Sequence, residues 1–398
     1  ATKTGDRAEM DFLPDRSQLW KHICSRRDDC MGGRCPEYSR CFMLKLRMKA
    51  QASDLVVVNH HLFFADAAMR KSAAISALPD AQAVVFDEAH LLDEIVTQFL
   101  GVHVGQPEIL DFLRLIKRWK PTRKDLGGEK WRMTGALGSV EEGAAMFFGS
   151  MGSGEGRFDL LPSLTDEACR HGVVLIERLE YLAGEIKKDG LIPEEFAQEW
   201  FQICRELSDS IRFFIHHDEP GMAWWGEYGR QGNTLHASPV NIADDFPGMI
   251  QDPPRPVILT SATLTTGSSF KYIVDRLGIH GCGTATYPSP FDYSSQGMIY
   301  IPRHLPPPNT YEFINQCAEE IKKIVNATKG RAFVLTTSYS ALNKLRELLE
   351  DELSYTLYVQ GDMPKHRLIS EFTADVDSVL LATISFWQGV DVPGESLS

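Results

Sequence analysis

Short apolar runs that end in polar turns predict buried strands at both ends of the chain. The predicted β-type runs are DLVVVNHHLFF (54–64), AQAVVFDEAH (81–90), PVILTSATL (256–264) and SVLLATISFWQGVDVPG (378–394). Residues 330–353 read as a strand, a polar turn and an amphipathic helix in succession. Apolar strands joined by helices are typical of parallel sheets that are covered on both faces, so the predicted fold class is α/β.

The region between these strands, residues 93–250, has a different period. Its apolar residues recur every three or four positions, which predicts helices over 108–119, 166–188 and 193–214. We therefore expect a mainly helical block inserted between β segments.

Composition limits the function classes. The chain has 398 residues, of which 43% are hydrophobic and 24% are charged, and these values predict a globular protein of two or three domains. It contains no apolar run of about 18 residues and does not start like a signal peptide, so we expect no membrane partner. The net charge of −13 argues against a uniform nucleic-acid-binding surface but permits a local basic path. The eight cysteines are unevenly spaced, which fits a reducing, cytoplasmic compartment.

Two acids follow the apolar residues of AVVFDEAH (83–90). In doubly wound α/β proteins functional groups gather at the carboxyl ends of strands, where Asp87 and Glu88 would lie. Asp87 could hold Mg²⁺ through its water shell, and Glu88 could activate the water that attacks a γ-phosphate. His90 could pass the nucleotide state to another loop. The alternative is that both acids merely begin a helix, where the dipole favours them.

Two other strands end in similar chemistry. Ser261 and Thr263 follow PVILT, and their hydroxyls could bridge a catalytic side chain to another loop, although such residues also cap helices. The loop after SVLLAT carries the last three candidates for coupling, namely Gln388, Gly389 and Asp391. Three such sites in this order strengthen the catalytic interpretation of the acidic pair.

At these residues the sequence resembles a family. DEAH, SATL, LTTSYSAL (335–342), VQGD (359–362) and SFWQGVDVPG (385–394) resemble motifs II, III, IV, IVa and V of superfamily-two helicases. Four cysteines ahead of DEAH are similar to the iron–sulfur, XPD-like DNA helicases, and VVVNHHLFF and YPSPFDY (287–293) resemble their bacterial DinG/YoaA members.

The resemblance implies two RecA-like motor domains with parallel sheets, both incomplete, an iron–sulfur domain and a helical Arch insertion. The implied domains are an iron–sulfur domain with a flanking motor segment (1–50), motor domain 1 (51–92 and 251–275), the Arch-like insertion (93–250) and motor domain 2 (276–398). The implied activity is ATP-driven 5′→3′ unwinding of DNA.

Two elements of such a motor, the phosphate-binding loop and motif VI, have no match in the sequence. No glycine-rich loop followed by Lys-Ser or Lys-Thr occurs in the sequence, and the arginine-bearing motif VI would lie beyond motif V. We therefore expect an internal fragment that by itself binds ATP poorly and does not hydrolyse it.

The four clustered cysteines predict a metal centre. Their order is Cys24-x5-Cys30-x4-Cys35-x5-Cys41, and four thiolates can hold either zinc or a [4Fe–4S] cluster. Structural zinc sites mostly use tighter spacings, and the resemblance adds to the case for iron, which makes [4Fe–4S] the preferred cofactor beside ATP and Mg²⁺. Ligation would supply folding energy to a polar loop with little core.

The cysteine region is also locally basic. Residues 16–49 contain nine Lys and Arg and three acids, with Trp20, Tyr38 and Phe42 interleaved. This mixture predicts contact with a single strand, although a solvated helix face with a buried aromatic side is the alternative. The candidate contacts here are Arg26, Arg27, Arg34, Arg40 and Lys45. A second basic stretch, 114–124, is open to both interpretations.

Further nucleic-acid contacts are predicted at the carboxyl ends of the later strands. Hydroxyls in the turn Thr336, Thr337, Ser338 and Tyr339 suit phosphate contacts that are independent of sequence. The resemblance adds Gln360, Thr383 and Trp387 to the same path.

The predicted function is thus a DNA helicase that acts on single-stranded and forked DNA. We expect it in the bacterial cytoplasm near the nucleoid, with replication or repair proteins as partners. Two alternatives remain: a helicase acting on RNA or RNA–DNA hybrids, and a non-catalytic nucleic-acid-binding protein with a degenerate motor.

Overall fold

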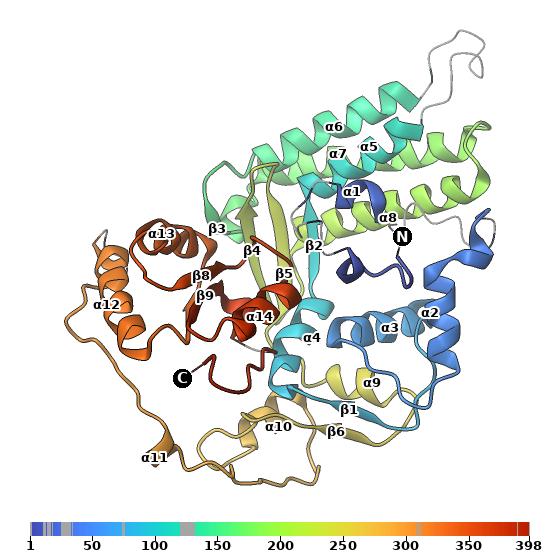
Figure 1. The fold of residues 1–398 in the computed structure, drawn as a ribbon. Coiled ribbons are helices and arrows are strands. Elements are labelled where there is room, and N and C mark those ends of the chain that lie inside the picture. The colour runs from blue at the N-terminus through green and yellow to red at the C-terminus, as the bar shows by residue number, and fades with distance from the viewer. Residues whose placement is uncertain are drawn as a thin grey trace. The chain divides into compact units, whose positions relative to one another are not determined.

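The computed structural model describes residues 2–10, 13, 17, 19–24, 33, 35–73, 76–119, 131, 133–308, 310, 312–387 and 389–397. The chain divides into two compact units, one of Ala1–Lys49 with Tyr287–Ser398 and one of Ala50–Thr286. Figure 1 labels the helices and strands. The predicted domain boundaries within these units stay a prediction.

The unit Ala50–Thr286 contains a two-stranded parallel sheet of β1 (Val84–Phe86) and β6 (Val257–Leu259). Helices α3 (His60–Ala73), α4 (Leu92–Leu100), α9 (Phe246–Gln251) and α10 (Lys271–Leu277) belong with it. Phe64 of α3, Phe86 of β1 and Phe246 of α9 meet in one core cluster. Their burial holds α3 against the strand that ends in the acidic pair.

A second layer of the same unit is a four-stranded antiparallel sheet in the order β2-β5-β4-β3. Its strands are β2 (Val102–Gly105), β3 (Gly156–Asp159), β4 (Met222–Tyr228) and β5 (Thr234–Pro239). Helices α5 (Gln106–Trp119), α6 (Met133–Gly149), α7 (Asp166–Lys188) and α8 (Glu194–His216) pack beside it (Figure 1). Val104, Leu235 and Ala237 share the helices' core, so the helices cover one face of this sheet.

The helical predictions of this region are confirmed, and local chemistry explains the ends of α7. The Thr165 hydroxyl accepts a hydrogen bond from the Ala168 N–H at 3.2 Å, and Asp166 and Glu167 lie in the first turn. Lys187 and Lys188 lie in the last turn, where the helix dipole favours positive charge. The antiparallel sheet was not predicted.

The prediction of a β-type run over residues 54–64 is wrong. Residues 55–59 form no strand, and His60 begins helix α3. The Asn59 side chain accepts a hydrogen bond from the Leu62 N–H at 2.8 Å, as an N-terminal cap does. Burial of Phe64 in the core then favours helix over strand, despite the valines just before it.

The other unit contains a parallel sheet in the order β7-β9-β8, formed by β7 (Ala332–Thr336), β8 (Thr356–Val359) and β9 (Ser378–Thr383). Its helices are α1 (Trp20–Ile23), α11 (Tyr293–Gln296), α12 (Phe313–Thr328), α13 (Tyr339–Leu349) and α14 (Lys365–Ala374). Helix α2 (Phe42–Gln51) crosses the division between the units.

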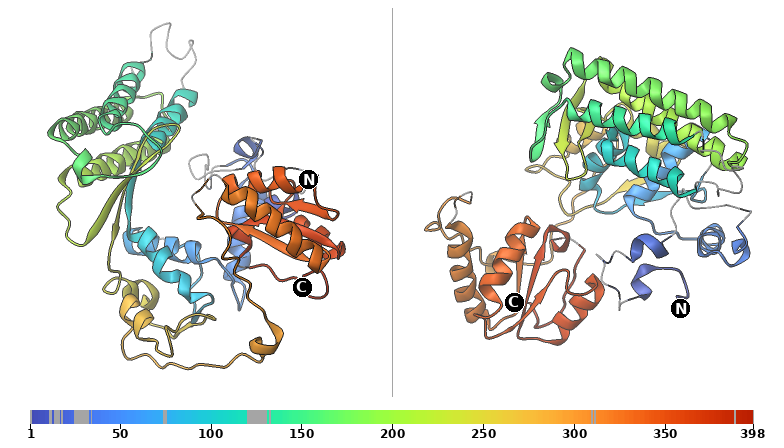
Figure 2. Two further views of the ribbon diagram at one scale, coloured as in Figure 1. Left: turned by 90° about the vertical axis from the view of Figure 1, so that its left-hand side faces the viewer. Right: turned by 90° about the horizontal axis from the view of Figure 1, so that it is seen from above.

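The central strand β9 is buried at all six positions. Leu381 packs with α12 and α13, whereas Leu380 and Ala382 pack with α14, so successive side chains face opposite sides of the sheet. Helices cover both faces of this sheet (Figure 2). Parallel strands with helices on both faces confirm the predicted α/β class.

Candidate motor sites at two strand edges

The first site lies where β1 and β6 end. Ladder bonds continue past both strands, from Thr260 N–H to the Phe86 carbonyl at 2.8 Å and from Ala89 N–H to the Thr260 carbonyl at 2.9 Å. These bonds hold the DEAH segment beside the segment Ser261–Thr263. Two motifs far apart in the sequence therefore meet at one sheet edge, because β1 and β6 are parallel and end side by side.

Side chains join the two segments directly. His90 Nδ1 lies 2.8 Å from Ser261 Oγ and 3.4 Å from a carboxylate oxygen of Glu88. Ser261 Oγ also accepts from the Thr263 N–H at 3.2 Å. Asp87 and Glu88 are exposed at this edge, and Asp87 Oδ1 accepts from the Glu88 N–H at 3.0 Å. The four-residue motif thus exposes the Asp87 carboxylate, while its histidine contacts both the half-exposed Glu88 carboxylate and the neighbouring loop.

The backbone of Glu88 is left-handed, with φ of 49° and ψ of 42°. A residue with a side chain rarely adopts this conformation, and such strain persists where surrounding contacts impose it. Here the imposed turn separates Glu88 from strand geometry and lets Ala89–Leu91 start a short 3-10 helix ahead of α4. The acidic pair is therefore not simply the first turn of a regular α-helix.

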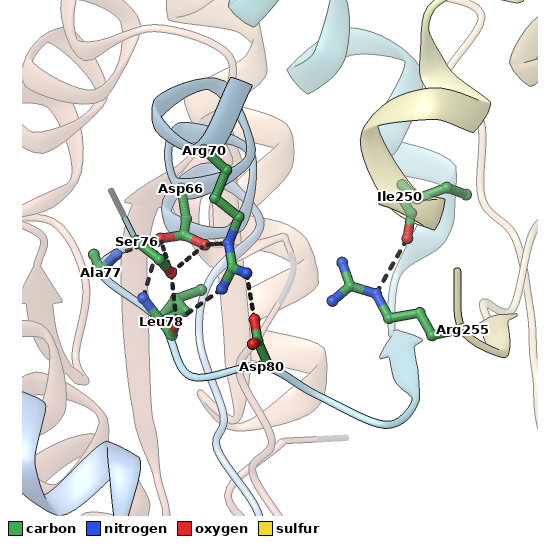
Figure 3. A network of polar contacts seen from close by, with 8 residues as sticks. All are labelled: Asp66, Arg70, Ser76, Ala77, Leu78, Asp80, Ile250 and Arg255. Carbon is green, nitrogen blue, oxygen red and sulfur yellow. Dashed lines mark hydrogen bonds and ion pairs between the residues drawn. The ribbon is translucent and has the colours of Figure 1, made fainter. Parts of the chain in front are cut away.

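A polar network supports this sheet from its opposite edge (Figure 3). Asp66 of α3 is only 3% exposed, and it accepts hydrogen bonds from Arg70 Nε at 2.6 Å, Ser76 Oγ at 3.0 Å and Leu78 N–H at 3.0 Å. Burial alone raises the pKa of Asp66, but the bonds from Arg70 and the backbone outweigh it and the pKa is lowered. The network fixes the loop that leads into β1.

Arg255 extends the support to β6. Its Nε donates to the Ile250 carbonyl at 3.3 Å (Figure 3). Its guanidinium lies 5.5 Å from the ring centroid of Phe63. Burial lowers the pKa of Arg255, and the nearby Arg70 lowers it further. Residues just ahead of both strands are thereby anchored to α3 and α9.

The second site lies at the carboxyl edge of β7, β8 and β9. Gln360, just after β8, contacts the end of β9 and the start of α13, the helix that follows β7. Its Oε1 accepts from Thr383 N–H at 2.7 Å and its Nε2 donates to Tyr339 Oη at 2.9 Å. Asp362, two residues on, pairs with Arg346 of α13 at 2.8 Å and fixes the loop from its other side. The structure therefore brings the predicted residues of three separate segments together.

These residues differ in exposure. Thr337, Ser338, Tyr339 and Trp387 are exposed, with Trp387 at 62%, whereas Thr336 and Thr383 are only 7% and 4% exposed. Ser338 Oγ accepts from the Ala341 N–H at 3.1 Å and caps α13. Gly389 adopts a φ of 66° and Asp391 is exposed in the same loop, while the predicted Gln388 lies outside the described residues.

Ser385 and Lys365 also lie at this edge, although neither was predicted as a site residue. Ser385 Oγ lies 3.0 Å from Gln360 Nε2, and Lys365 Nζ donates to the Ser385 carbonyl at 2.8 Å. Ser385 belongs to the quoted motif SFWQGVDVPG, so its place in that motif was the available signal.

Three of the four clustered cysteines lie within the described residues. Cys24, Cys35 and Cys41 are free thiols of intermediate burial, and Cys30 lies outside the described residues. Where the chain is described, no group of three or more His, Cys, Asp or Glu side chains is close enough to hold a metal ion. The structure does not gather these three thiols into a cluster, so the metal centre stays a prediction from their spacing.

The basic residues near the cysteines are only partly described. Arg40 is exposed and pairs with Glu37 at 3.3 Å, and Lys45 lies 5.9 Å from the Phe42 ring centroid. Arg26, Arg27 and Arg34 lie outside the described residues. Trp20 is buried with Arg7 over its ring at 4.3 Å, which favours the core interpretation for this aromatic residue.

The second basic stretch, 114–124, is described as far as residue 119. Arg114 pairs with Asp111 at 2.6 Å and Lys117 pairs with Glu141. These ion pairs favour a solvated helix face for the first half of the stretch.

Across the described helices, none is both long and apolar enough to span a bilayer.

Known proteins that are similar to this chain include helicases. The family described as Helicase C-terminal domain matches residues 321–398, which contain β7, β8 and β9. Over 400 residues, and the whole of this chain, the sequence is 32% identical to the ATP-dependent DNA helicase YoaA of Haemophilus influenzae. The chain is a homologue of the YoaA and DinG helicases. The resemblance predicted from the motifs is thereby confirmed.

The match to DinG is weaker but equally extensive. The chain is 28% identical over 422 residues to the ATP-dependent helicase DinG of Mycobacterium tuberculosis, all of this chain aligning with 59% of DinG. It spans 62% of the length of the Haemophilus YoaA. Among solved structures, one named XPD helicase aligns with a TM-score of 0.46 and 15% identity, covering 86% of this chain and 56% of that chain.

Proposed function

We propose that this YoaA/DinG homologue acts as an ATP-dependent DNA helicase that moves 5′→3′ on single-stranded DNA and separates forked duplexes. The observation that carries the proposal is the contact of His90 with Ser261 at 2.8 Å, which joins the DEAH segment to the SATL segment at one strand edge. If Asp87 and Glu88 only began a helix, the histidine that follows them would need no contact with a distant loop.

The exposed carboxylates define the proposed hydrolytic roles. Asp87 would hold Mg²⁺ through water molecules, because Mg²⁺ binds few protein ligands and keeps several waters. Glu88 would orient and deprotonate the attacking water, and ATP and Mg²⁺ both fit a helicase of this family. His90, Ser261, Thr263, Gln388, Gly389 and Asp391 would couple the state of the nucleotide to movement.

The proposed DNA path uses exposed groups of the other strand edge. Thr337, Ser338 and Tyr339 offer hydroxyls to phosphates, and Trp387 offers an exposed ring on which a base can stack. The basic residues near the cysteines would add phosphate contacts. The cysteines themselves would hold a [4Fe–4S] cluster whose role is to fold the surrounding loop.

The wider assignments rest on the same homology. We propose a cytoplasmic protein that works near the nucleoid with replication or repair partners, and whose 93–250 region acts as an Arch-like insertion. The 398 residues alone should hydrolyse little ATP, because no glycine-rich phosphate loop occurs among them.

The deciding experiment is strand displacement by the complete gene product. Forked DNA with a 5′ single-stranded arm, the same fork with a 3′ arm, and matching RNA and hybrid forks are compared with and without ATP. We expect unwinding of the 5′-armed DNA alone, and its loss in Glu88→Gln. Equal activity on RNA forks would favour an RNA helicase, and binding without ATP turnover would favour a degenerate motor.

A further inference from the structure

The amide of Gln360 uses all its hydrogen-bonding capacity inside the protein. Oε1 accepts from the N–H and the hydroxyl of Thr383, at 2.7 and 2.9 Å, while Nε2 donates to Tyr339 Oη at 2.9 Å and to Ser385 Oγ at 3.0 Å. A side-chain amide has two acceptor sites and two donor hydrogens, so these four bonds saturate it. Since the Thr383 N–H can only donate, it also fixes which end of the amide is oxygen.

The same contacts divide the hydroxyls of this edge into two kinds. Thr383 donates its hydroxyl hydrogen to Gln360, and Thr336 donates its own to the Ser338 carbonyl at 3.1 Å. Both threonines are buried, so neither hydroxyl is available to a ligand. Ser385 is different, because it is exposed and its oxygen accepts from Gln360.

The hydrogen bond that Ser385 Oγ accepts from Gln360 determines where the Ser385 hydroxyl hydrogen can point. A lone pair of Oγ faces the Nε2 hydrogen, so the hydroxyl hydrogen must point to another side. Lys365 Nζ holds the Ser385 carbonyl at 2.8 Å and lies 4.7 Å from the ring centroid of Phe386, which fixes the serine backbone and places an ammonium beside it. An exposed donor next to a positive charge suits an anionic oxygen.

We propose that Ser385 donates a hydrogen bond to a phosphate of single-stranded DNA, and that Gln360 is the positioning residue that presents it. The proposal rests on the proposed function and deepens it. It removes Gln360 and Thr383 from the set of direct contacts and adds Ser385, which shares its loop with the exposed Trp387.

The first test measures binding of the complete gene product to a fluorescent oligo(dT) at several salt concentrations. We expect Ser385→Ala to weaken binding by about tenfold, the size of one hydrogen bond to a charged group. The slope of log K against log salt should not change, because a neutral hydroxyl displaces no counterion. Ser370→Ala, an exposed serine of α14, serves as the control and should bind as the unmodified chain does.

The second test asks whether Gln360 acts through its partners. Gln360→Met should weaken binding at least as much as Ser385→Ala, and adding Ser385→Ala to it should change affinity less than about twofold, because coupled residues are not additive. Gln360→Glu should also bind weakly, since its carboxylate draws the Ser385 hydrogen inward. Melting temperatures of all variants accompany the affinities.

The outcomes separate this inference from the function on which it rests. Unchanged affinity in Ser385→Ala, or a full additional loss when it is combined with Gln360→Met, overturns the inference while DNA binding by the unmodified chain survives. Failure of the unmodified chain to bind oligo(dT) overturns the proposed function itself. A lowered melting temperature with normal affinity in Gln360→Met assigns Gln360 a structural role only and also overturns the inference.

Discussion

His90 Nδ1 lies 2.8 Å from Ser261 Oγ, although 171 positions separate the two residues in the sequence. The parallel pairing of β1 with β6 makes the contact possible, because Phe86 and Leu259 are register partners at the ends of the strands. The exposed Asp87 and Glu88 lie at the same edge, and His90 Nδ1 is also 3.4 Å from the Glu88 carboxylate, so the histidine connects that carboxylate to the SATL loop. The contact between His90 and Ser261 therefore suits a link that reports on the nucleotide site without taking part in hydrolysis.

Ser261→Ala should uncouple unwinding from hydrolysis. The change removes one partner of His90 and leaves both acids in place, so ATP turnover should stay within about twofold while base pairs unwound per ATP fall by about fivefold, the equivalent of one neutral hydrogen bond. The measurement pairs a phosphate-release assay with strand displacement, using the complete gene product.

Ser268→Ala is the matched control, since Ser268 is an exposed serine a few residues further along the same loop. It should behave as the unmodified protein in both assays. Parallel losses of hydrolysis and unwinding in Ser261→Ala would place Ser261 in the hydrolytic machinery and contradict a coupling role.

The sequence predicted β1, β6, β7 and β9 because each is a short apolar run that ends in polar residues. It failed at Val56–Val58, where three valines form no strand, because the Asn59 cap and the burial of Phe64 decide the structure there. A local β preference cannot reveal that competing tertiary contact.

The antiparallel sheet β2-β5-β4-β3 was not predicted, although the alternating residues of β4 indicate a strand. MAWWGEY (222–228) places Trp224 in the helical core, and Trp225 stacks instead on His236 of the neighbouring strand at 5.1 Å. Side chains that alternate between faces indicate a strand, but the strong three-four pattern of the flanking helices dominated the prediction.

At the edge of β7, β8 and β9, the residue types predicted where the polar side chains gather but not what each hydroxyl does. Thr336, Thr383 and Ser338 carry the same kind of hydroxyl, yet two are buried donors to the protein and the third caps a helix. Spacing in a sequence cannot distinguish these, because the difference depends on which strand is central in the sheet.

Asp66→Asn should destabilise the unit Ala50–Thr286. The buried Asp66 carboxylate accepts hydrogen bonds from Arg70, Ser76 and the Leu78 N–H, and an asparagine amide replaces one acceptor oxygen with a donor that faces these donors, so the free energy of unfolding should fall by about 3 kcal/mol at pH 7. Asp80→Asn is the control, because Asp80 pairs with the same arginine but is 79% exposed and should contribute at most about 1 kcal/mol. Urea unfolding monitored by circular dichroism gives both values.

The same carboxylate predicts a dependence on pH. Its pKa is lowered by folding, so its contribution is fully present above the unfolded value of about 3.9 and is lost as pH falls through the lower folded value. The stability difference between the unmodified chain and Asp66→Asn should therefore shrink below about pH 4. A difference that stays constant down to pH 2 would show that Asp66 does not ionise differently in the two states.

Trp387→Ala should weaken binding of single-stranded DNA. The ring is 62% exposed beside Ser385, and base stacking on an aromatic side chain contributes about 1–3 kcal/mol, so affinity for oligo(dT) should fall by about fivefold or more. Trp387→Phe should retain most of the affinity, because phenylalanine keeps an aromatic face. Fluorescence anisotropy at constant salt measures all three proteins.

Tyr181→Ala provides the comparison for a lost exposed ring, since Tyr181 is 59% exposed on α7 in the other unit. Its affinity should equal that of the unmodified chain. An equal loss in both variants would mean that the assay detects general surface hydrophobicity, and stacking on Trp387 would then have no support.

The spacing of Cys24, Cys30, Cys35 and Cys41 predicts that anaerobically purified protein is coloured. Four thiolates holding [4Fe–4S] give a broad charge-transfer absorption with about four irons and four sulfides per chain, whereas zinc leaves the protein colourless. Cys41→Ser should abolish the absorption and lower the melting temperature, because a loop without its own core depends on ligation to fold. Cys282→Ser, an exposed cysteine far from the others in sequence, should change neither. Stoichiometric zinc in a colourless protein would keep the folding role of the four cysteines but remove iron from it, and the likeness to the iron–sulfur helicases would then rest on the motor motifs alone.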